Sequence, residues 1–265
     1  MPELAEVEYF RKRWDVGAGQ KVMAVRVHAN KRVFRKLNAH AMASALTGTK
    51  FLSSEARGKQ MLFHFSKENW LGIHLGMSGS LRVEKRGYDA AKHDHFVLRQ
   101  SRQTLVFHDP RMFGQVRWDQ GPTEPDWWTK LPPPLDSPAF TLRSMREFLA
   151  RRKRSPIKAA LLDQKLFPGV GNWMADEILW QSRLDPCAAC TELDQSDTRR
   201  LCQKTRSICR TALQTIGVNW SDPPKSWLFH VRWKRRSQCP RDGTQLRHAT
   251  IAGRTTAWCP QCQSG

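Results

Sequence analysis

The sequence has no apolar run long enough to span a bilayer, which takes about 20 consecutive apolar residues in a helix. It is charged from Glu3 onward and lacks the apolar segment of a secretory signal, so we expect an intracellular protein that is not secreted. Seven cysteines are an odd number in such a chain. This argues against a disulfide framework and favours free thiols or metal ligation.

Acidic residues are scarce relative to basic ones. The 265 residues include 44 Lys and Arg but only 24 Asp and Glu, which gives a formal net charge of +20. Such an excess predicts a polyanionic partner, and nucleic acid is the first candidate. An acidic membrane surface is the other candidate, but no basic amphipathic helix stands beside a lipid anchor. We therefore expect a nucleic acid and no membrane.

The apolar pattern changes along the chain and predicts an α+β protein with several domains. Residues 3–15 and 140–216 have helical spacing, whereas short apolar runs between them predict a β-rich domain. These runs lie at 22–27, 61–65, 71–75, 96–98 and 104–107. Six prolines between 121 and 138 predict a linker. The expected divisions are 1–120, a linker at 121–139, 140–226, and a metal-binding hairpin at 227–265.

The N-terminus offers an unusual nucleophile. If Met1 is removed, Pro2 carries a free secondary amine, which can attack an aldehyde-like carbon and form an iminium intermediate. An α-amine titrates at roughly pH 7.7–8.0, so part of it is unprotonated in the cell. Glu3 could pass protons during sugar opening. The first six residues alone favour a proline that merely starts a helix.

A glycine-rich turn stands between two helical patterns, at 157–166 and from Asn172 onward. Gly169 and Gly171 allow a tight turn and a close backbone approach. Asn172 is a good N-cap for the second helix, and the exposed N–H groups there favour a phosphate. An ordinary connector between two helices explains a Gly-x-Gly pair equally well.

Several motifs together carry a family resemblance, and they occur in the family's order over nearly the whole chain. They are Pro2-Glu3-Leu4-Ala5-Glu6-Val7-Glu8, Arg57-Gly58-Lys59, Lys92-His93-Asp94-His95, Asp109-Pro110-Arg111-Met112-Phe113-Gly114 and Pro168-Gly169-Val170-Gly171-Asn172 with the following Ala175-Asp176-Glu177-Ile178-Leu179. The chain resembles the formamidopyrimidine-DNA glycosylase / endonuclease VIII family of base-excision repair enzymes, and the first of these two branches more closely.

The resemblance implies a fold and an activity. The expected fold is an N-terminal β-sandwich, a helical domain with a helix–two-turns–helix element, and a C-terminal zinc-finger β-hairpin. The expected activity is that of a bifunctional DNA glycosylase and AP lyase that acts on damaged double-stranded DNA. It needs no redox or small-molecule cofactor. Such an enzyme is expected to be a monomer in the cytoplasm, associated with the bacterial nucleoid.

The resemblance also assigns roles to residues. Pro2 is the expected nucleophile at the sugar C1′, Glu3 protonates the ring oxygen, Lys59 assists β-elimination, and Arg254 at the hairpin tip assists δ-elimination. The expected DNA-binding residues are Glu6, Met77, His93, Arg111, Phe113, Lys153 and Asn172. Lys153 belongs to a basic run, 151–154, which also fits a solvated helix end.

Three of these residues bear on the substrate. Met77, Arg111 and Phe113 are expected to fill the gap left by an extruded base, as in the branch that removes oxidised purines. However, residues 217–224 form a short segment where that branch usually has a longer loop over the base. Action on oxidised pyrimidines or single strands therefore stays open, as does a damaged-DNA-binding protein without catalysis.

The C-terminal hairpin departs from the family pattern. Cys259 and Cys262 form an intact Cys-x-x-Cys, but the first pair consists of Cys239 and Asp242. Three thiolates and one aspartate can hold a structural zinc ion. His248 as the fourth ligand and a metal-free hairpin are the alternatives. Another pair, Cys187 and Cys190, has no assigned role, while Cys202 and Cys209 have the spacing of core residues.

Overall fold

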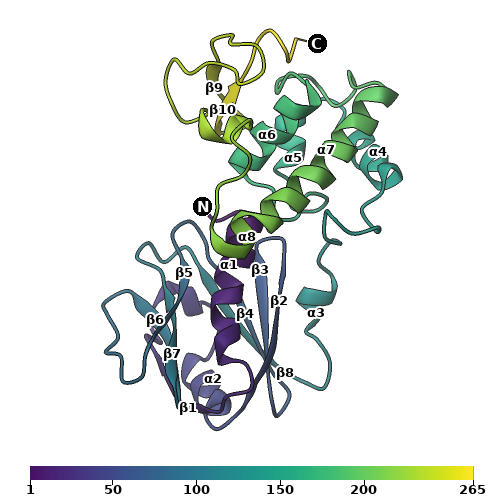
Figure 1. Ribbon diagram of the computed structural model, residues 1–265. Helices are drawn as coiled ribbons and strands as arrows, with labels where there is room; N and C mark the ends of the chain where they lie inside the picture. The colour runs from purple at the N-terminus through teal and green to yellow at the C-terminus, as the bar shows by residue number, and fades with distance from the viewer. Residues whose placement is uncertain (265) are drawn as a thin grey trace. The chain divides into compact units, whose positions relative to one another are not determined.

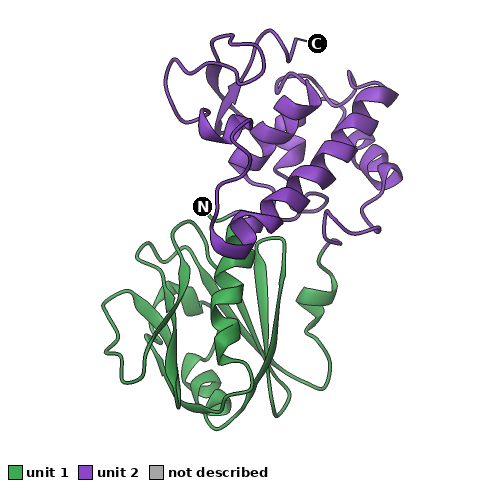
Figure 2. Cartoon of the chain, in the orientation of Figure 1, with its two compact units in different colours: residues 1–2, 6–131 green, residues 3–5, 132–265 purple. Residues whose placement is uncertain are grey.

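The computed structural model describes residues 1–264. The chain divides into two units (Figure 2), the first comprising residues 1–2 and 6–131 and the second residues 3–5 and 132–265. The division after Leu131 falls inside the predicted linker, which also contains the short helix α3 (Asp126–Thr129). The finer domain bounds given above stay predictions. In the described part of the chain, no helix is both long and apolar enough to cross a membrane.

The first unit contains two four-stranded antiparallel sheets (Figure 1), with strand orders β1-β6-β7-β5 and β2-β3-β4-β8. The strands are β1 (Val22–Val27), β2 (Phe51–Arg57), β3 (Gln60–Phe65), β4 (Asn69–His74), β5 (Ser80–Lys85), β6 (Asp94–Gln100), β7 (Gln103–His108) and β8 (Gln115–Gln120). Helix α2 (Ala39–Leu46) and the 3-10 turns η1 (Asp15–Gly17) and η2 (Arg32–Phe34) complete it. All five predicted apolar runs lie in strands.

Helix α1 (Leu4–Trp14) joins the two sheets through one shared core. Trp14 is fully buried, and its ring centroid lies 4.9 Å from that of Phe63 in β3 and 6.1 Å from that of Phe96 in β6. Burial of apolar side chains from both sheets against one helix is the main stabilising contribution in such a layered unit. The predicted helix at residues 3–15 is confirmed.

The second unit is helical and ends in a two-stranded hairpin (Figure 1). Its elements are α4 (Leu142–Ala150), α5 (Ile157–Leu161), α6 (Asn172–Ser182), α7 (Gln195–Gln214), α8 (Ile216–Asn219), the 3-10 turn η3 (Leu228–His230), β9 (Arg247–Ile251) and β10 (Arg254–Trp258). Cys202 and Cys209 lie in its core, as predicted. The helix expected at 157–166 ends at Leu161, because the Asp163 carboxylate accepts the Lys165 N–H and forms a turn.

Candidate functional site

The side chain of Glu3 lies at the N-terminal end of α6 and is buried. Its Oε2 atom accepts hydrogen bonds from the backbone N–H groups of Gly171 (2.9 Å) and Met174 (3.1 Å), and Oε1 accepts one from Trp173 (3.0 Å). The first N–H groups of a helix have no partner within the helix and carry a partial positive charge. These groups therefore hold the Glu3 carboxylate in place and stabilise its negative charge.

Gly171 is required by this arrangement. A Cβ atom added to residue 171 would collide with the carboxyl group and the Cγ atom of Glu3. Any larger residue would therefore push the Glu3 side chain away from the helix end. Pro2 is held next to this point by its peptide bond to Glu3 and is half-buried.

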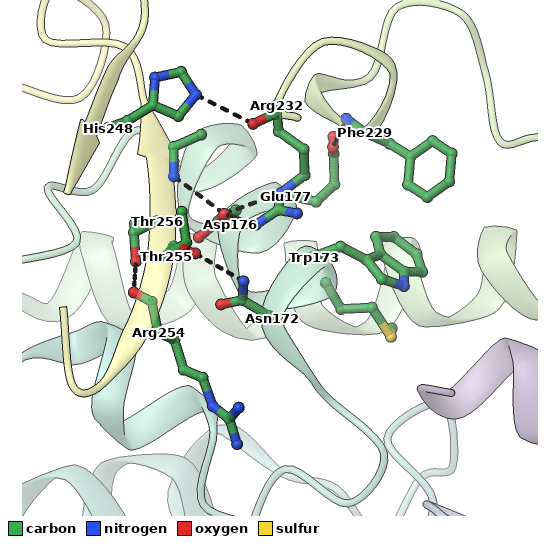
Figure 3. A network of polar contacts seen from close by, with 12 residues as sticks. Asn172, Trp173, Asp176, Glu177, Phe229, Arg232, His248, Arg254, Thr255 and Thr256 are labelled. Carbon is green, nitrogen blue, oxygen red and sulfur yellow. Dashed lines mark hydrogen bonds and ion pairs between the residues drawn. The ribbon is translucent and has the colours of Figure 1, made fainter. Parts of the chain in front are cut away.

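The prediction that Asn172 caps α6 is wrong. The N-cap position is occupied by Gly171, which has no side chain, and the carboxylate that serves the helix end comes from Glu3. The N–H groups of Gly171, Trp173 and Met174 already donate to Glu3 and are therefore not exposed at this helix end, whereas a phosphate contact of Asn172 itself stays a prediction. The Asn172 side chain instead points to the hairpin, where its amide donates to the Thr255 carbonyl at 2.7 Å (Figure 3).

A buried ionic cluster fixes the hairpin to the helices. Asp176 on α6 accepts hydrogen bonds from Arg232 (Figure 3), from Lys158 and from the backbone N–H of Ala257, the last at 3.2 Å. All three charged side chains are at most 3% exposed. Burial lowers the pKa of Lys158, against the attraction of Asp176. Two further carboxylates act on these cations, Glu3 on Lys158 and Glu177 on Arg232.

Glu177, next along α6, holds the 3-10 turn η3. It accepts hydrogen bonds from the backbone N–H of Phe229 at 3.0 Å (Figure 3) and from the side chain of Gln181 at 2.8 Å. Burial raises the pKa of Glu177 to about 7, although both hydrogen bonds act in the opposite direction. This side chain therefore exchanges a proton near neutral pH.

Arg254 lies at the tip of the hairpin. It follows Ala252 and Gly253, whose positive φ angles of 51° and 70° form the turn. Its side chain is exposed and extends away from the ionic cluster in Figure 3. Lys153 is also exposed and follows α4, where its carbonyl accepts hydrogen bonds from the N–H and the hydroxyl of Thr191.

In the first unit, two loops bring together the side chains expected to fill the gap in the duplex. Met77 and Phe113 are exposed, at 37% and 40%, which is unusual for large apolar side chains. The Arg111 guanidinium lies over the Phe113 ring, 5.0 Å from its centroid. A Cβ atom at residue 76 would collide with the backbone of residues 113–114, so a glycine is needed where the loops touch.

Asp109 ties these two loops together, a role that the sequence analysis missed. It is fully buried and accepts hydrogen bonds from the Ser78 hydroxyl at 2.9 Å and the Gly114 N–H at 2.7 Å. Ser78 follows Met77, and Gly114 follows Phe113. The signal was present, because Asp109 begins the Asp-Pro-Arg motif, but only the contacts reveal its function.

The remaining predicted residues of the first unit lie in separate places. Lys59 is in the two-residue turn between β2 and β3 and is half-buried. Burial and then the charge of Lys59 lower the pKa of His74 to about 4. His93 precedes β6 and packs edge-on against the rings of His95 and His108, with centroids 6.4 and 6.1 Å away. Glu6 is half-buried in α1.

The four predicted metal ligands come together at the base of the hairpin. One ligand atom each of Cys239, Asp242, Cys259 and Cys262 lies within 4.8 Å of the others. The backbone N–H of Thr244 lowers the pKa of Asp242 to about 2, so its carboxylate is ionised. Two groups donate to the sulfurs, as in thiolate metal sites: the indole N–H of Trp180 to Cys239 at 3.3 Å, and the backbone N–H of Cys262 to Cys259 at 3.4 Å.

His248 lies away from this cluster. Its Nε2 atom is 3.2 Å from the Arg232 carbonyl (Figure 3). Among the described residues, all seven cysteines are free thiols. Cys190 is buried and its N–H donates to the Ser155 carbonyl, whereas Cys187 is exposed. These two cysteines belong to the loop that pairs with residues 155–157.

Comparison with known proteins gives one consistent result. Residues 1–116 match the formamidopyrimidine-DNA glycosylase N-terminal domain, and residues 131–222 match the formamidopyrimidine-DNA glycosylase H2TH domain. The chain is 35% identical to the formamidopyrimidine-DNA glycosylase of Dechloromonas aromatica, over 99% of this chain and all of the relative. It is also 35% identical to that of Thermus thermophilus, over 99% and 98% of the two chains.

Solved structures agree over the full length. A MutM protein in complex with DNA containing carbocyclic 8-oxo-G matches with a TM-score of 0.89 and 28% identity, over all of both chains. The Lactococcus lactis Fpg (MutM) protein in complex with DNA containing an oxidised pyrimidine matches with the same score, identity and coverage. The predicted α+β fold with a sandwich, helices and a hairpin is confirmed.

Proposed function

This chain belongs to the formamidopyrimidine-DNA glycosylase family of DNA-repair glycosylases and AP lyases, and from that premise we propose that it removes oxidised purines from DNA through a covalent Pro2 intermediate. The purines are 8-oxoguanine and formamidopyrimidines. The partner is double-stranded DNA with a damaged base, and the protein acts as a monomer inside the cell, in the cytoplasm with the nucleoid.

The reaction starts at the sugar. After removal of Met1, the neutral amine of Pro2 attacks C1′, and the base leaves with the electrons of the glycosidic bond. The new C–N bond leaves one proton on the Pro2 nitrogen, and the Glu3 carboxylate takes it. Glu3 then delivers this proton to the ring oxygen as the sugar opens to the iminium. Loss of a C2′ proton expels the 3′ phosphate, and a second elimination expels the 5′ phosphate, which leaves a one-nucleotide gap.

The observation that carries this proposal is the position of Glu3. Glu3 is the residue next to the nucleophile, and three backbone N–H groups stabilise its carboxylate. The N–H groups hold the ionised carboxylate beside the nucleophile, and its fixed negative charge stabilises the cationic iminium that follows; from the same position it relays the proton between Pro2 and the ring oxygen.

The other residues have supporting roles in the proposal. Lys59 assists β-elimination, and Arg254 assists δ-elimination. Met77, Arg111 and Phe113 fill the space of the extruded base, which costs a few kcal/mol to unstack. His93, Lys153 and Asn172 contact the phosphates, and Glu6 extends the carboxylate group around Glu3.

The proposed cofactor is one structural zinc ion. Cys239, Asp242, Cys259 and Cys262 supply three thiolates and one carboxylate, a donor set suited to tetrahedral zinc. The ion would fix the base of the hairpin that carries Arg254. No step of the reaction passes through it.

Borohydride trapping tests this function. Protein shown by mass spectrometry to begin at Pro2 is incubated with duplexes that contain 8-oxoguanine, an oxidised pyrimidine or an abasic site, and the iminium is reduced. We expect a covalent adduct with 8-oxoguanine, and none from protein whose Pro2 amine is acylated. Absence of an adduct even at the abasic site would mean that the chain only binds damaged DNA.

A second substrate class has one specific observation in its favour. Residues 220–227 alone connect α8 to η3, and His230 Nε2 lies 2.9 Å from the Pro223 carbonyl, which holds this connection in place. A short, fixed segment selects less strongly for one base than a long loop that closes over it. Trapping only on the oxidised pyrimidine would keep the mechanism and change the substrate.

A further inference from the structure

A pocket in the second unit lies beside the ionic cluster and has no part in the reaction described so far. Its volume is about 470 Å³. Its lining includes Asn172, Trp233, Arg235 and His248, together with Thr250 and Thr255 from the two hairpin strands. We call it the Trp233 pocket. A volume of this size suits a small organic ligand such as a single nucleotide.

Trp233 forms the unusual part of this pocket. The side chain is 64% exposed, the largest exposure among the large apolar residues described. One face of the indole is covered, since the Arg232 guanidinium lies 3.8 Å from the ring centroid. Arg232 itself is held by Asp176. The ring is therefore stacked on a fixed cation on one side and is largely exposed to solvent.

An aromatic ring arranged in this way is suited to stack on another flat group. Every nucleobase has a π-face. Stacking of a base on an aromatic side chain therefore contributes to the binding free energy whichever base it is. A large exposed apolar side chain on a highly charged protein also indicates a contact surface. The exposed area of Trp233 would be removed from water by such stacking.

The charges around the ring favour a phosphate next to the base. Asp176 is shared by two basic side chains, Lys158 and Arg232. Among residues 1–264, the Nη1 atom of Arg232 has no acceptor although it is buried. Arg235 adds an exposed guanidinium to the lining. A phosphate in the pocket would give these arginines an anionic acceptor.

We propose that the Trp233 pocket is a nucleotide subsite, in which an unstacked base of the bound DNA stacks on Trp233 and its phosphate contacts Arg235. This inference rests on the proposed function, because it takes damaged DNA as the ligand. The nucleotide is a neighbour of the damaged one, because the extruded damaged base belongs to the reaction already proposed at Pro2 and Glu3.

Fluorescence of 2-aminopurine tests this subsite. The full-length, zinc-loaded protein is bound to duplexes that contain a tetrahydrofuran abasic analogue, which cannot be attacked. 2-Aminopurine replaces a neighbouring base at successive positions, or takes the lesion position in a separate duplex. We expect strong quenching at one position with the wild type, retained by Trp233→Phe and lost in Trp233→Ala. The position that responds identifies the nucleotide.

Affinity provides the second measurement. Trp233→Ala should bind the tetrahydrofuran duplex about tenfold more weakly, as expected for the loss of one stacked base. Met23→Ala is the control, because Met23 in β1 is 58% exposed but does not line the pocket and has no proposed role in DNA binding. Unfolding midpoints should be unchanged in both variants.

Equal affinity and quenching in Trp233→Ala and the wild type would overturn the subsite, as would a protein that binds none of the duplexes. Because the analogue forms no iminium, the outcome is separate from borohydride trapping. A lack of trapping with intact quenching would refute the mechanism and leave the subsite standing.

Discussion

The carboxylate of Glu3 lies at the N-terminal end of α6, whereas that of Asp242 lies among three thiols at the base of the hairpin. Glu3 is buried and its partners are backbone N–H groups, which no substitution of a side chain removes. Asp242 is exposed, and its neighbours are sulfur atoms that can bind a metal. In the function that we propose, the same functional group serves a proton-transfer step in one place and metal ligation in the other, and the neighbours decide which.

The largest effect on activity is expected when the carboxylate of Glu3 is displaced. Gly171→Ala removes no functional group, but the added methyl group forces the Glu3 carboxylate away from α6. We expect base release to fall at least about a hundredfold, as it should in Glu3→Gln. Single-turnover release of 8-oxoguanine measures this. Gly121→Ala is the control, because a Cβ atom there meets nothing within 4 Å. Full activity of Gly171→Ala would show that the position of Glu3 is not needed.

Asp176 extends the comparison to a carboxylate whose partners are side-chain cations. Asp176→Asn leaves Lys158 and Arg232 buried without a counter-charge. We expect the free energy of unfolding to fall by about 3–5 kcal/mol, measured by urea denaturation. Asp126→Asn, which removes an exposed pair with Lys130, should show no measurable change. Equal stability of both variants would mean that the buried cluster contributes nothing.

Glu177 is a third buried carboxylate, and its contribution to the free energy of unfolding should depend on pH. Its folded pKa of about 7 lies above the value of 4.5 for a free glutamate, so folding takes up a proton between these two values. The free energy of unfolding should therefore fall as the pH rises from about 4.5 to about 7, by at most about 3 kcal/mol. In Glu177→Gln this part of the slope should disappear, whereas exposed Glu147→Gln should keep it. An identical pH profile for wild type and Glu177→Gln would contradict the burial argument.

The smallest effect is expected at Asp242. Asp242→Ala removes one of four ligands and should weaken zinc binding by about tenfold or more, which is about 1.4 kcal/mol or more. Asp242→Cys should restore or tighten it, since thiolate is a strong zinc ligand. Competition with a chromogenic chelator gives both values, with exposed Asp222→Ala as the control. If Asp242→Ala retains zinc as tightly as the wild type, the carboxylate is not a ligand.

The sequence predicted those strands whose residues are buried on both faces. The central strands β3, β4, β6 and β7 read as continuous apolar runs, because each has a sheet neighbour on both sides and packs in the interior. Three edge strands, β2, β5 and β8, were not among the predicted runs. They carry polar residues on their exposed positions, as in Ser53-Ser54-Glu55 of β2, and this weakens the apolar signal.

The candidate site divides in a similar way. The metal cluster could be predicted, because the family resemblance supplies two pairs of ligand positions at the ends of a hairpin and Asp242 stands at one of them. The cap of α6 could not, since Glu3 is 168 positions away from Gly171 and local propensity selects Asn172. Arg232 is likewise 56 positions from Asp176, and Ser78 is 31 positions from Asp109. Contacts between remote positions carry no local signature, and a single sequence taken without its relatives contains no other record of them.

The chain passes from one unit to the other after residue 2, within helix α1 after residue 5, and again after residue 131. A gene fragment for residues 132–265 would therefore encode a helical unit without Glu3, and each N–H group at the start of α6 that stays buried would lack its acceptor, at about 1–3 kcal/mol. We expect an exchange of residues 6–131 to preserve the helical unit better than a truncation that removes residues 3–5. The codons for residues 3–5 would then behave in recombination as part of the second half of the gene, although the whole β-sandwich is encoded between them.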